Sequence, residues 1–196
     1  YVVPPETFFE GIYCLLPGHY LWYRDGKVTT TRYFEATFKP DESLTLDKAV
    51  DEIEAVFEDS VNAHKISDVE VGCFLSSGVD SSYVSTYFAD QKTFTVGFDF
   101  GDHYNEISWA KRLSEKIGVD HHTKLIGSDE FWGAVPKVQY QMDQPLADPS
   151  CIALYFVSKL ASKYVKVVLS GEGADELFGG YTVYNEPHVF KLYQKI

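Results

Sequence analysis

The spacing of hydrophobic positions changes after residue 40. From Thr45, apolar residues recur every three or four positions, which predicts an amphipathic helix to about His64. Beyond it, short apolar runs alternate with helical patterns. The expected strands are 69–75, 93–98, 121–126 and 165–169, and the expected helices are 81–90, 106–117, 129–141 and 150–163, with a short element from Glu176. This alternation predicts an α/β fold with a mostly parallel sheet flanked by helices.

The first forty residues follow a different pattern. Residues 19–23 and 28–34 alternate in the manner of strands around an Asp25-Gly26 turn, which predicts a β-hairpin before the α/β part. A two-stranded hairpin is marginal alone and must pack on something. Residues 1–40 are therefore interpreted as the tail of a preceding β-rich domain plus a linker. Because Tyr1 is not an initiator methionine, we expect the chain to be a piece of a longer polypeptide.

Composition and charge narrow the class of protein. The chain is 45% hydrophobic and 16% aromatic, which is typical of a globular domain. Its formal net charge is -12 without a Lys/Arg run, which argues against partners such as nucleic acid or an anionic membrane. No apolar stretch approaches the ~20 residues of a membrane span.

The cysteines and histidines do not indicate a metal site or a catalytic role. Three widely spaced cysteines and the absence of a signal peptide favour a reducing, cytoplasmic setting. Cys73 lies in an apolar run, where a buried inert thiol is expected. The histidines lack zinc-ligand spacing, and a structural role is favoured for His121 and His122.

Two short segments carry the candidate chemistry. Residues 75–82 and 169–176 each follow an apolar, β-branched run and place small residues and a carboxylate where a strand would end. Backbone N–H groups of such turns can bind a polyphosphate, and a carboxylate can hold Mg²⁺. Neither segment is a Walker A loop or a dinucleotide fingerprint, because Gly26-Lys27 lies in the hairpin turn and Glu176 replaces the third glycine after Gly171 and Gly173.

These residues carry a family resemblance. Leu75-Ser-Ser-Gly-Val-Asp-Ser81 resembles the loop of the PP-loop ATP pyrophosphatases, which cleave ATP between the α- and β-phosphates. Leu169-Ser-Gly-Glu-Gly-Ala-Asp-Glu-Leu-Phe-Gly-Gly-Tyr181 resembles the second signature of glutamine-dependent asparagine synthetases. The stretch 8–20 resembles the region that joins the glutaminase domain of that family to its synthetase domain. The resemblance therefore covers nearly the whole chain.

The resemblance implies a fold and a domain organisation. The expected fold is that of the PP-loop ATP pyrophosphatases, also described as adenine nucleotide alpha hydrolase-like. Residues 1–40 would be the tail of an N-terminal glutaminase-type domain plus a linker. Residues 41–196 would be an ATP-binding synthetase domain that is truncated at its C-terminus.

It also implies roles for individual residues. The pyrophosphate loop that binds ATP would consist of Ser76, Ser77, Gly78, Asp80 and Ser81. Leu75 and Val96 would frame the adenine. Ser170 and Gly171 of the second signature would contact the nucleotide through their backbone. Asp80 and Asp175 would be ligands of Mg²⁺. Glu172 would be catalytic, as a proton acceptor or charge stabiliser in ammonia attack. The structural alternatives are a Glu172 that caps the next helix and an Asp175 that is its N-cap.

The implied activity is ATP-dependent asparagine synthesis, with β-aspartyl-AMP as the intermediate and ammonia derived from glutamine. Aspartate, ATP and ammonia would be the small-molecule substrates, and ATP and Mg²⁺ the cofactors. The glutaminase domain is expected in the same parent polypeptide, and a homodimer is compatible with this organisation. Two alternatives stay open: a related amidotransferase or amide- or lactam-forming ligase acting on another carboxylate, and a non-catalytic ATP-binding module.

Three departures from the family pattern matter. Ser77 replaces a loop glycine and would tolerate a left-handed backbone less well. The segment 143–150 has no arginine to bind the α-carboxylate of aspartate. The N-terminal cysteine that hydrolyses glutamine and a later catalytic lysine are missing, since Lys191 and Lys195 lie too close to the second signature. The chain alone is therefore expected to be inactive.

Overall fold

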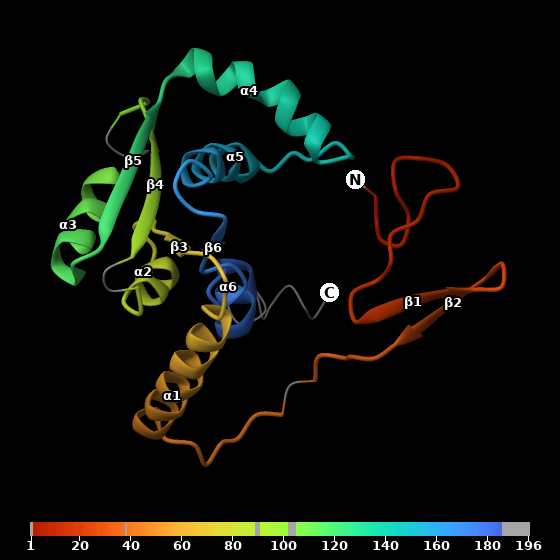
Figure 1. The fold of residues 1–196 in the computed structure, drawn as a ribbon. Coiled ribbons are helices and arrows are strands. Elements are labelled where there is room, and N and C mark those ends of the chain that lie inside the picture. The colour runs from red at the N-terminus through yellow and green to blue at the C-terminus, as the bar shows by residue number, and fades with distance from the viewer. Residues whose placement is uncertain (1, 38, 89–90, 102–104, 186–196) are drawn as a thin grey trace, which may run out of the picture.

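The computed structural model describes residues 2–37, 39–88, 91–101 and 105–185. Its α/β part is built on a four-stranded parallel sheet, which stands apart from the N-terminal hairpin (Figure 1). The strands stand in the order β5-β4-β3-β6, with the bounds Asp120–Ile126, Lys92–Phe98, Val71–Phe74 and Val167–Leu169. Across the sheet, β3, β4 and β5 lie next to one another in chain order, and β6 pairs with the other edge of β3. The expected parallel α/β fold is confirmed.

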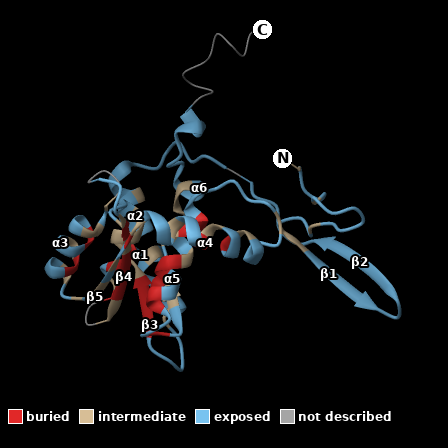
Figure 2. Cartoon of the chain, turned by 90° about the horizontal axis from the view of Figure 1, so that it is seen from above, coloured by how far each residue is buried: buried red, intermediate tan, exposed pale blue. Residues whose placement is uncertain are grey.

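Helices connect the strands and cover the sheet. Their bounds are α1 (Leu46–His64), α2 (Val79–Ser85), α3 (Ile107–Ile117), α4 (Ser128–Gln141), α5 (Ser150–Ala161) and α6 (Ala174–Phe178), followed by a 3-10 turn at Thr182–Asn185. One buried cluster joins α1 and α2 to β3 around Cys73 and Phe88, which are both fully buried. Two others join α4 and α5 to β4 and β5, so the buried residues concentrate in the sheet and α5 (Figure 2).

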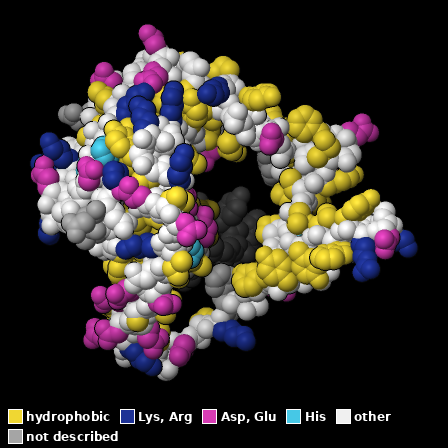
Figure 3. Space-filling view, viewed as in Figure 1, with side chains coloured by type: hydrophobic (Ala, Val, Ile, Leu, Met, Phe, Trp, Pro, Cys, Tyr) yellow, Lys and Arg dark blue, Asp and Glu magenta, His cyan; other side chains and the backbone are white. Residues whose placement is uncertain are grey.

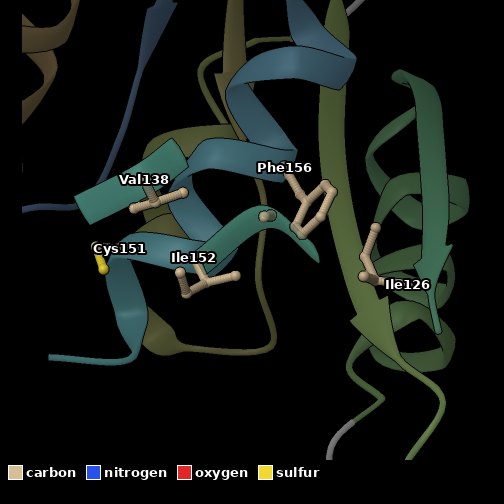
Figure 4. Close-up of a cluster of buried hydrophobic side chains, with 6 residues drawn as sticks. Ile126, Val138, Cys151, Ile152 and Phe156 are labelled. Carbon is tan, nitrogen blue, oxygen red and sulfur yellow. The ribbon is translucent and has the colours of Figure 1, made fainter. Parts of the chain in front are cut away.

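The cluster beneath α4 and α5 shows how apolar spacing builds the core. Val138 of α4 and Ile152 and Phe156 of α5 gather with Ile126 at the end of β5 (Figure 4). Cys151 lies in the same cluster, and its thiol donates a hydrogen bond to the Asp148 carbonyl at 2.9 Å. The loop before α5 is thereby tied to the core.

The N-terminal hairpin forms as predicted. Strands β1 (His19–Arg24) and β2 (Lys27–Arg32) pair antiparallel, and φ is 51° at Asp25 and 74° at Gly26, as a type I′ turn requires. The second strand ends at Arg32 rather than at residue 34. Hydrophobic side chains, including Trp22 at 60% exposure, lie open on the hairpin, on the right of Figure 3.

The predicted ends of several strands and helices were wrong by a few residues. Strand β3 begins at Val71 instead of 69, and β6 begins at Val167 instead of 165, because pairing starts where Val71 meets Val167. Helix α2 runs over Val79–Ser85 rather than 81–90, since the backbone turns at residues 86–88; positions 89–90 lie outside the described residues. Helix α5 ends two residues early, and α6 begins at Ala174, before the expected Glu176.

The first long helix starts where its cap was expected. The Thr45 side chain accepts a hydrogen bond from the Lys48 backbone N–H at 3.4 Å. No helix within the described ranges is long and apolar enough to cross a membrane.

Candidate nucleotide site

The two motif segments leave the sheet side by side. Strands β3 and β6 are neighbours, with Cys73 opposite Leu169, so the turns that follow them meet at the same edge. A β-carbon built on Gly171 would lie 2.8 Å from the Ser81 backbone nitrogen and 2.9 Å from the Asp80 Cβ. The second turn therefore packs directly on the beginning of α2, and only glycine fits there.

A pocket of about 150 Å³ opens between the two turns. Its lining residues come from both motifs and from the segment after α6: Ser76, Gly78, Asp80, Ser81, Gly171, Glu172, Gly173, Asp175 and Tyr181. The structure thus brings together most of the residues to which the sequence assigned a role. Tyr181, which had been given none, lines the same pocket.

Hydroxyl groups fix the shape of the first turn. The Ser81 Oγ accepts a hydrogen bond from the Ser76 backbone N–H at 3.0 Å and lies 2.7 Å from the Ser76 Oγ. The Ser76 Oγ in turn accepts one from the Gly78 N–H at 3.0 Å. Ser77 does not adopt the left-handed backbone, because among the described residues other than glycine only Asp25 and Asp143 have positive φ. The strain considered for this serine is therefore absent.

Glycines shape the second turn around Asp175. Gly173 has φ of 91° and occupies the N-cap position of α6, without a side-chain capping bond. A β-carbon on Gly180 would overlap Asp175 Oδ1, and the Gly180 N–H donates to the Asp175 carbonyl at 3.0 Å. Asp175 is half-buried in the first turn of α6, and Glu172 is exposed before it. Neither carboxylate is the N-cap, so both structural alternatives were wrong.

The pocket is electrostatically negative. Asp80, Glu172 and Asp175 line it, and the lining residues include no lysine or arginine. The Tyr181 hydroxyl donates a hydrogen bond to Glu176 Oε1 at 3.3 Å, and the nearby negative charge of Glu176, aided by burial, raises the pKa of Tyr181. A polyphosphate would meet repulsion here unless a cation accompanied it.

The donor set fits Mg²⁺ bound together with a substrate. Within the described ranges, no group of three His, Cys, Asp or Glu side chains is placed to hold a metal by itself. Magnesium is usually held by one or two carboxylates plus substrate phosphates and water. Two aspartates on one small pocket, Asp80 and Asp175, match that requirement.

The other predicted ATP-binding residues lie outside the pocket lining. The side chain of Leu75 is only 1% exposed, and its N–H donates to the Phe94 carbonyl at 2.9 Å. Val96 is half-buried and packs against the core beneath α5. Ser170 accepts a hydrogen bond from the Glu172 N–H at 3.4 Å through its Oγ. Their contacts with a nucleotide, like that of Ser77, stay predictions.

The sequence reading also missed Glu106. Its Oε2 accepts a hydrogen bond from the Ser77 backbone N–H at 3.3 Å, which brings a third strand end to the site. The sequence contained a signal, because a polar Asn105-Glu106 pair follows the expected strand 93–98 at the start of the expected helix 106–117. What the sequence did not show was that this side chain reaches back to the first turn.

Hydrogen bonds hold the segment 143–150 to α4 and to the N-terminal residues. The Gln139 side chain donates to the Leu146 carbonyl at 2.7 Å and accepts from the Leu146 N–H at 3.0 Å. Hydrogen bonds from the backbone and side chain of Ser150 lower the pKa of Asp148. Gln144 accepts a hydrogen bond from the Phe8 N–H at 3.3 Å, so this segment also contacts the N-terminal residues.

Comparison with known proteins places this geometry in a family. The model of the asparagine synthase family matches residues 52–196. The chain belongs to the asparagine synthase family. The parallel sheet with two facing turns agrees with the PP-loop fold expected for it.

Similarity to individual proteins covers nearly the whole chain, including residues before the family match. The chain is 42% identical, over its whole length, to "Asparagine synthetase [glutamine-hydrolyzing] 1" of Bacillus subtilis. It covers 32% of that protein. Over 95% of the chain it is 43% identical to a "Putative asparagine synthetase [glutamine-hydrolyzing]" of Mycobacterium tuberculosis, of which it covers 30%. "Amidase chry2" of Gibberella zeae is 30% identical over 93% of the chain, which covers 31% of it. The chain thus spans about a third of the length of these relatives.

Proposed function

We propose that this chain is the nucleotide-binding part of an AMP- and pyrophosphate-forming ligase that makes asparagine from aspartate, ATP and glutamine-derived ammonia. The observation that carries the proposal is the close packing of Gly171 on Asp80 and Ser81, which brings both motifs to one pocket. Membership of the asparagine synthase family and similarity to glutamine-hydrolysing asparagine synthetases supply the reaction class.

The phosphates of ATP would lie against the first turn. Ser76, Ser77, Gly78 and Ser81 offer backbone N–H and hydroxyl groups, and Asp80 and Asp175 would hold Mg²⁺. The metal ion would neutralise charge on the phosphates. The pocket is small beside the ~300–1,000 Å³ of typical ligand sites, so the described residues would enclose the phosphate end of the nucleotide rather than all of it. Leu75 and Val96, with Ser170 and Gly171, would contact the remainder.

Two chemical steps would follow. A β-carboxylate oxygen of aspartate attacks the α-phosphorus, the bond to the bridging oxygen breaks, and pyrophosphate leaves with β-aspartyl-AMP formed. Ammonia then attacks the acyl carbon, AMP leaves, and the nitrogen loses a proton. Glu172 would accept that proton or stabilise the charge, and its exposure at the pocket, away from the N-cap of α6, supports this role.

The proposal includes the rest of the parent protein. Residues 1–40 would end a glutaminase domain and link it to the synthetase domain that begins at 41. The hydrophobic side chains left open on the hairpin support this division, because they need a partner surface. The working enzyme would be cytoplasmic, and this chain alone would lack activity. Lys191 and Lys195, which were rejected as the catalytic lysine, lie outside the described residues.

Calorimetric titration of ATP with and without Mg²⁺ tests the proposal in the full-length protein. We expect Mg²⁺ to strengthen binding, and Asp80→Asn and Asp175→Asn each to weaken it by about tenfold or more, because each loses a charge that the metal needs. Asp59→Asn, on exposed α1, is the matched control and should bind as the wild type does. Binding that ignores both Mg²⁺ and the two variants would refute the metal site.

A second candidate is a related ligase that amidates another carboxylate or closes a lactam. The missing arginine in 143–150 favours it, as does similarity to "Amidase chry2". Pyrophosphate release measured across a panel of carboxylates would separate the candidates, since aspartate-dependent release supports asparagine synthesis. Magnesium-dependent ATP binding without turnover on any acceptor would instead indicate a non-catalytic module.

A further inference from the structure

A carboxylate already occupies one N–H group of the candidate phosphate loop. Glu106 stands at the N-cap position of α3, yet its side chain makes no capping bond to that helix. Its Oε2 accepts a hydrogen bond from the Ser77 backbone N–H at 3.3 Å instead. The neighbouring Asn105 satisfies the helix, because its Oδ1 accepts from the Ile107 N–H at 3.1 Å. Glu106 is therefore not needed as the helix cap.

Packing sets the position of Glu106. A β-carbon on Gly97, in β4, would lie 2.5 Å from Asn105 Oδ1 and 2.9 Å from Ile107 Cδ1. The turn before α3 is thus seated on the end of β4. Strand β4 is the parallel neighbour of β3, whose following loop contains Ser77. The carboxylate reaches that loop because the carboxyl ends of both strands share one edge of the sheet.

We infer that Glu106 is an internal anion of the phosphate loop, which the incoming pyrophosphate moiety of ATP must displace from the Ser77 N–H. The inference rests on the proposed function of the loop. Carboxylate and phosphate oxygens are both strong acceptors for a backbone N–H, and they compete for it. Glu106 is exposed and free to swing into solvent, whereas the loop is fixed by its serine hydroxyls. Its charge adds to that of a pocket already lined by carboxylates.

This arrangement makes the loop bind phosphate less tightly than its geometry allows. The same competition that opposes ATP binding also helps pyrophosphate to leave, since the returning carboxylate takes the vacated N–H. Glu106 would therefore set the balance between capture of ATP and release of pyrophosphate without touching the reacting atoms.

The test is calorimetric titration of the full-length protein with Mg²⁺–pyrophosphate and with Mg²⁺–ATP. Glu106→Gln keeps an acceptor but removes the charge, and Glu106→Ala removes both. We expect each to bind pyrophosphate about three- to tenfold more tightly than the wild type, from the loss of a like charge at close range. The gain should shrink between about 0.1 M and about 1 M salt, where the Debye length falls from about 10 Å to about 3 Å.

Glu115→Gln is the matched control, because it removes the same charge from an exposed position of α3 about 14 Å further along the helix, at 1.5 Å per residue. It should bind like the wild type. Weaker binding by Glu106→Ala, with wild-type binding by Glu106→Gln, would overturn the inference and show that Glu106 is a latch that orders the loop. Unchanged binding by both variants would also overturn it. Absence of binding by a folded wild-type protein would refute the proposed function itself and this inference with it.

Discussion

Gly171 and Ser81 lie so close together that a β-carbon on the glycine would come within 2.8 Å of the serine's backbone nitrogen. The next nearest atoms are also fixed, because they are the Cβ and carbonyl carbon of Asp80. A clash with backbone cannot be relieved by turning a side chain. The distance between the two turns, and with it the shape of the pocket, therefore depends on the absence of a side chain at position 171.

Gly171→Ala should separate the turns and weaken ATP binding by about tenfold or more, since overpacking costs roughly 1–3 kcal/mol. Calorimetry on the full-length protein measures it. Gly133→Ala is the control, because a β-carbon there meets nothing within 4 Å in the interior of α4. It should leave binding unchanged and raise stability by about 0.5–1 kcal/mol. Wild-type ATP affinity in Gly171→Ala would show that the pocket tolerates a wider spacing.

Glu172→Gln should divide the proposed reaction into its two halves. The amide cannot accept a proton, so asparagine formation should fall about 10²- to 10⁴-fold, the usual contribution of a general base. Aspartate-dependent pyrophosphate release in a single turnover should persist, because the attacking carboxylate has no proton to lose in that step. Rapid-quench measurement of pyrophosphate and asparagine on the same samples checks both.

Glu176→Gln provides the matched comparison. It removes an equal charge one turn later, where the carboxylate accepts a hydrogen bond from Tyr181. Asparagine formation should change less than in Glu172→Gln, since Glu176 does not line the pocket. Equal losses in both variants would indicate that the overall negative charge matters, and that Glu172 has no individual role.

The fold could be predicted because local patterns and chain topology agree. The helical spacing from Thr45, the Asp25-Gly26 turn and the β–α alternation are each readable along the chain, and the helix, the hairpin and the parallel sheet that they predict were confirmed. Strand ends depend instead on pairing, which is why β3 and β6 began two residues later than expected. A sequence pattern does not contain the register between segments that are far apart in the chain.

The candidate site was likewise predictable where it depends on local motifs, and not where it depends on contacts between distant segments. The motifs predicted that Asp80, Glu172 and Asp175 stand at strand ends, and the neighbouring strands bring all three to one pocket, while their roles stay predictions. Glu106 and Tyr181 were missed, because the Glu106 side chain reaches the distant Ser77 N–H and Tyr181 lines the pocket from the segment after α6. Such orientations depend on packing, and the spacing of residues along the chain does not specify them.

Cys73 should make stability depend on pH in the alkaline range. Burial raises the pKa of its thiol from 9.0 to about 12. Because the folded-state pKa is the higher one, the stabilising contribution is complete below about pH 9 and is lost as pH rises to about 12, at about 1.4 kcal/mol per unit. Denaturant unfolding at pH 8 and pH 10 should show the wild type losing that much relative to Cys73→Ala. Cys14→Ala, at a half-buried thiol, is the control, and parallel curves for all three proteins would contradict the assignment.

Gln139→Ala should loosen the segment 143–150 without disturbing the nucleotide pocket. The side chain makes two hydrogen bonds to Leu146, at 2.7 and 3.0 Å, and both are exposed, so their loss should cost about 1 kcal/mol or less of stability. If this segment shapes the acceptor side of the site, the KM for aspartate should rise severalfold while the affinity for ATP stays at the wild-type value. Steady-state kinetics with each substrate varied in turn measures both.

Gln141→Ala, on the same helix and exposed, is the control and should behave as the wild type. A change in ATP affinity alone would contradict the expectation and indicate that the segment acts on the nucleotide side of the site.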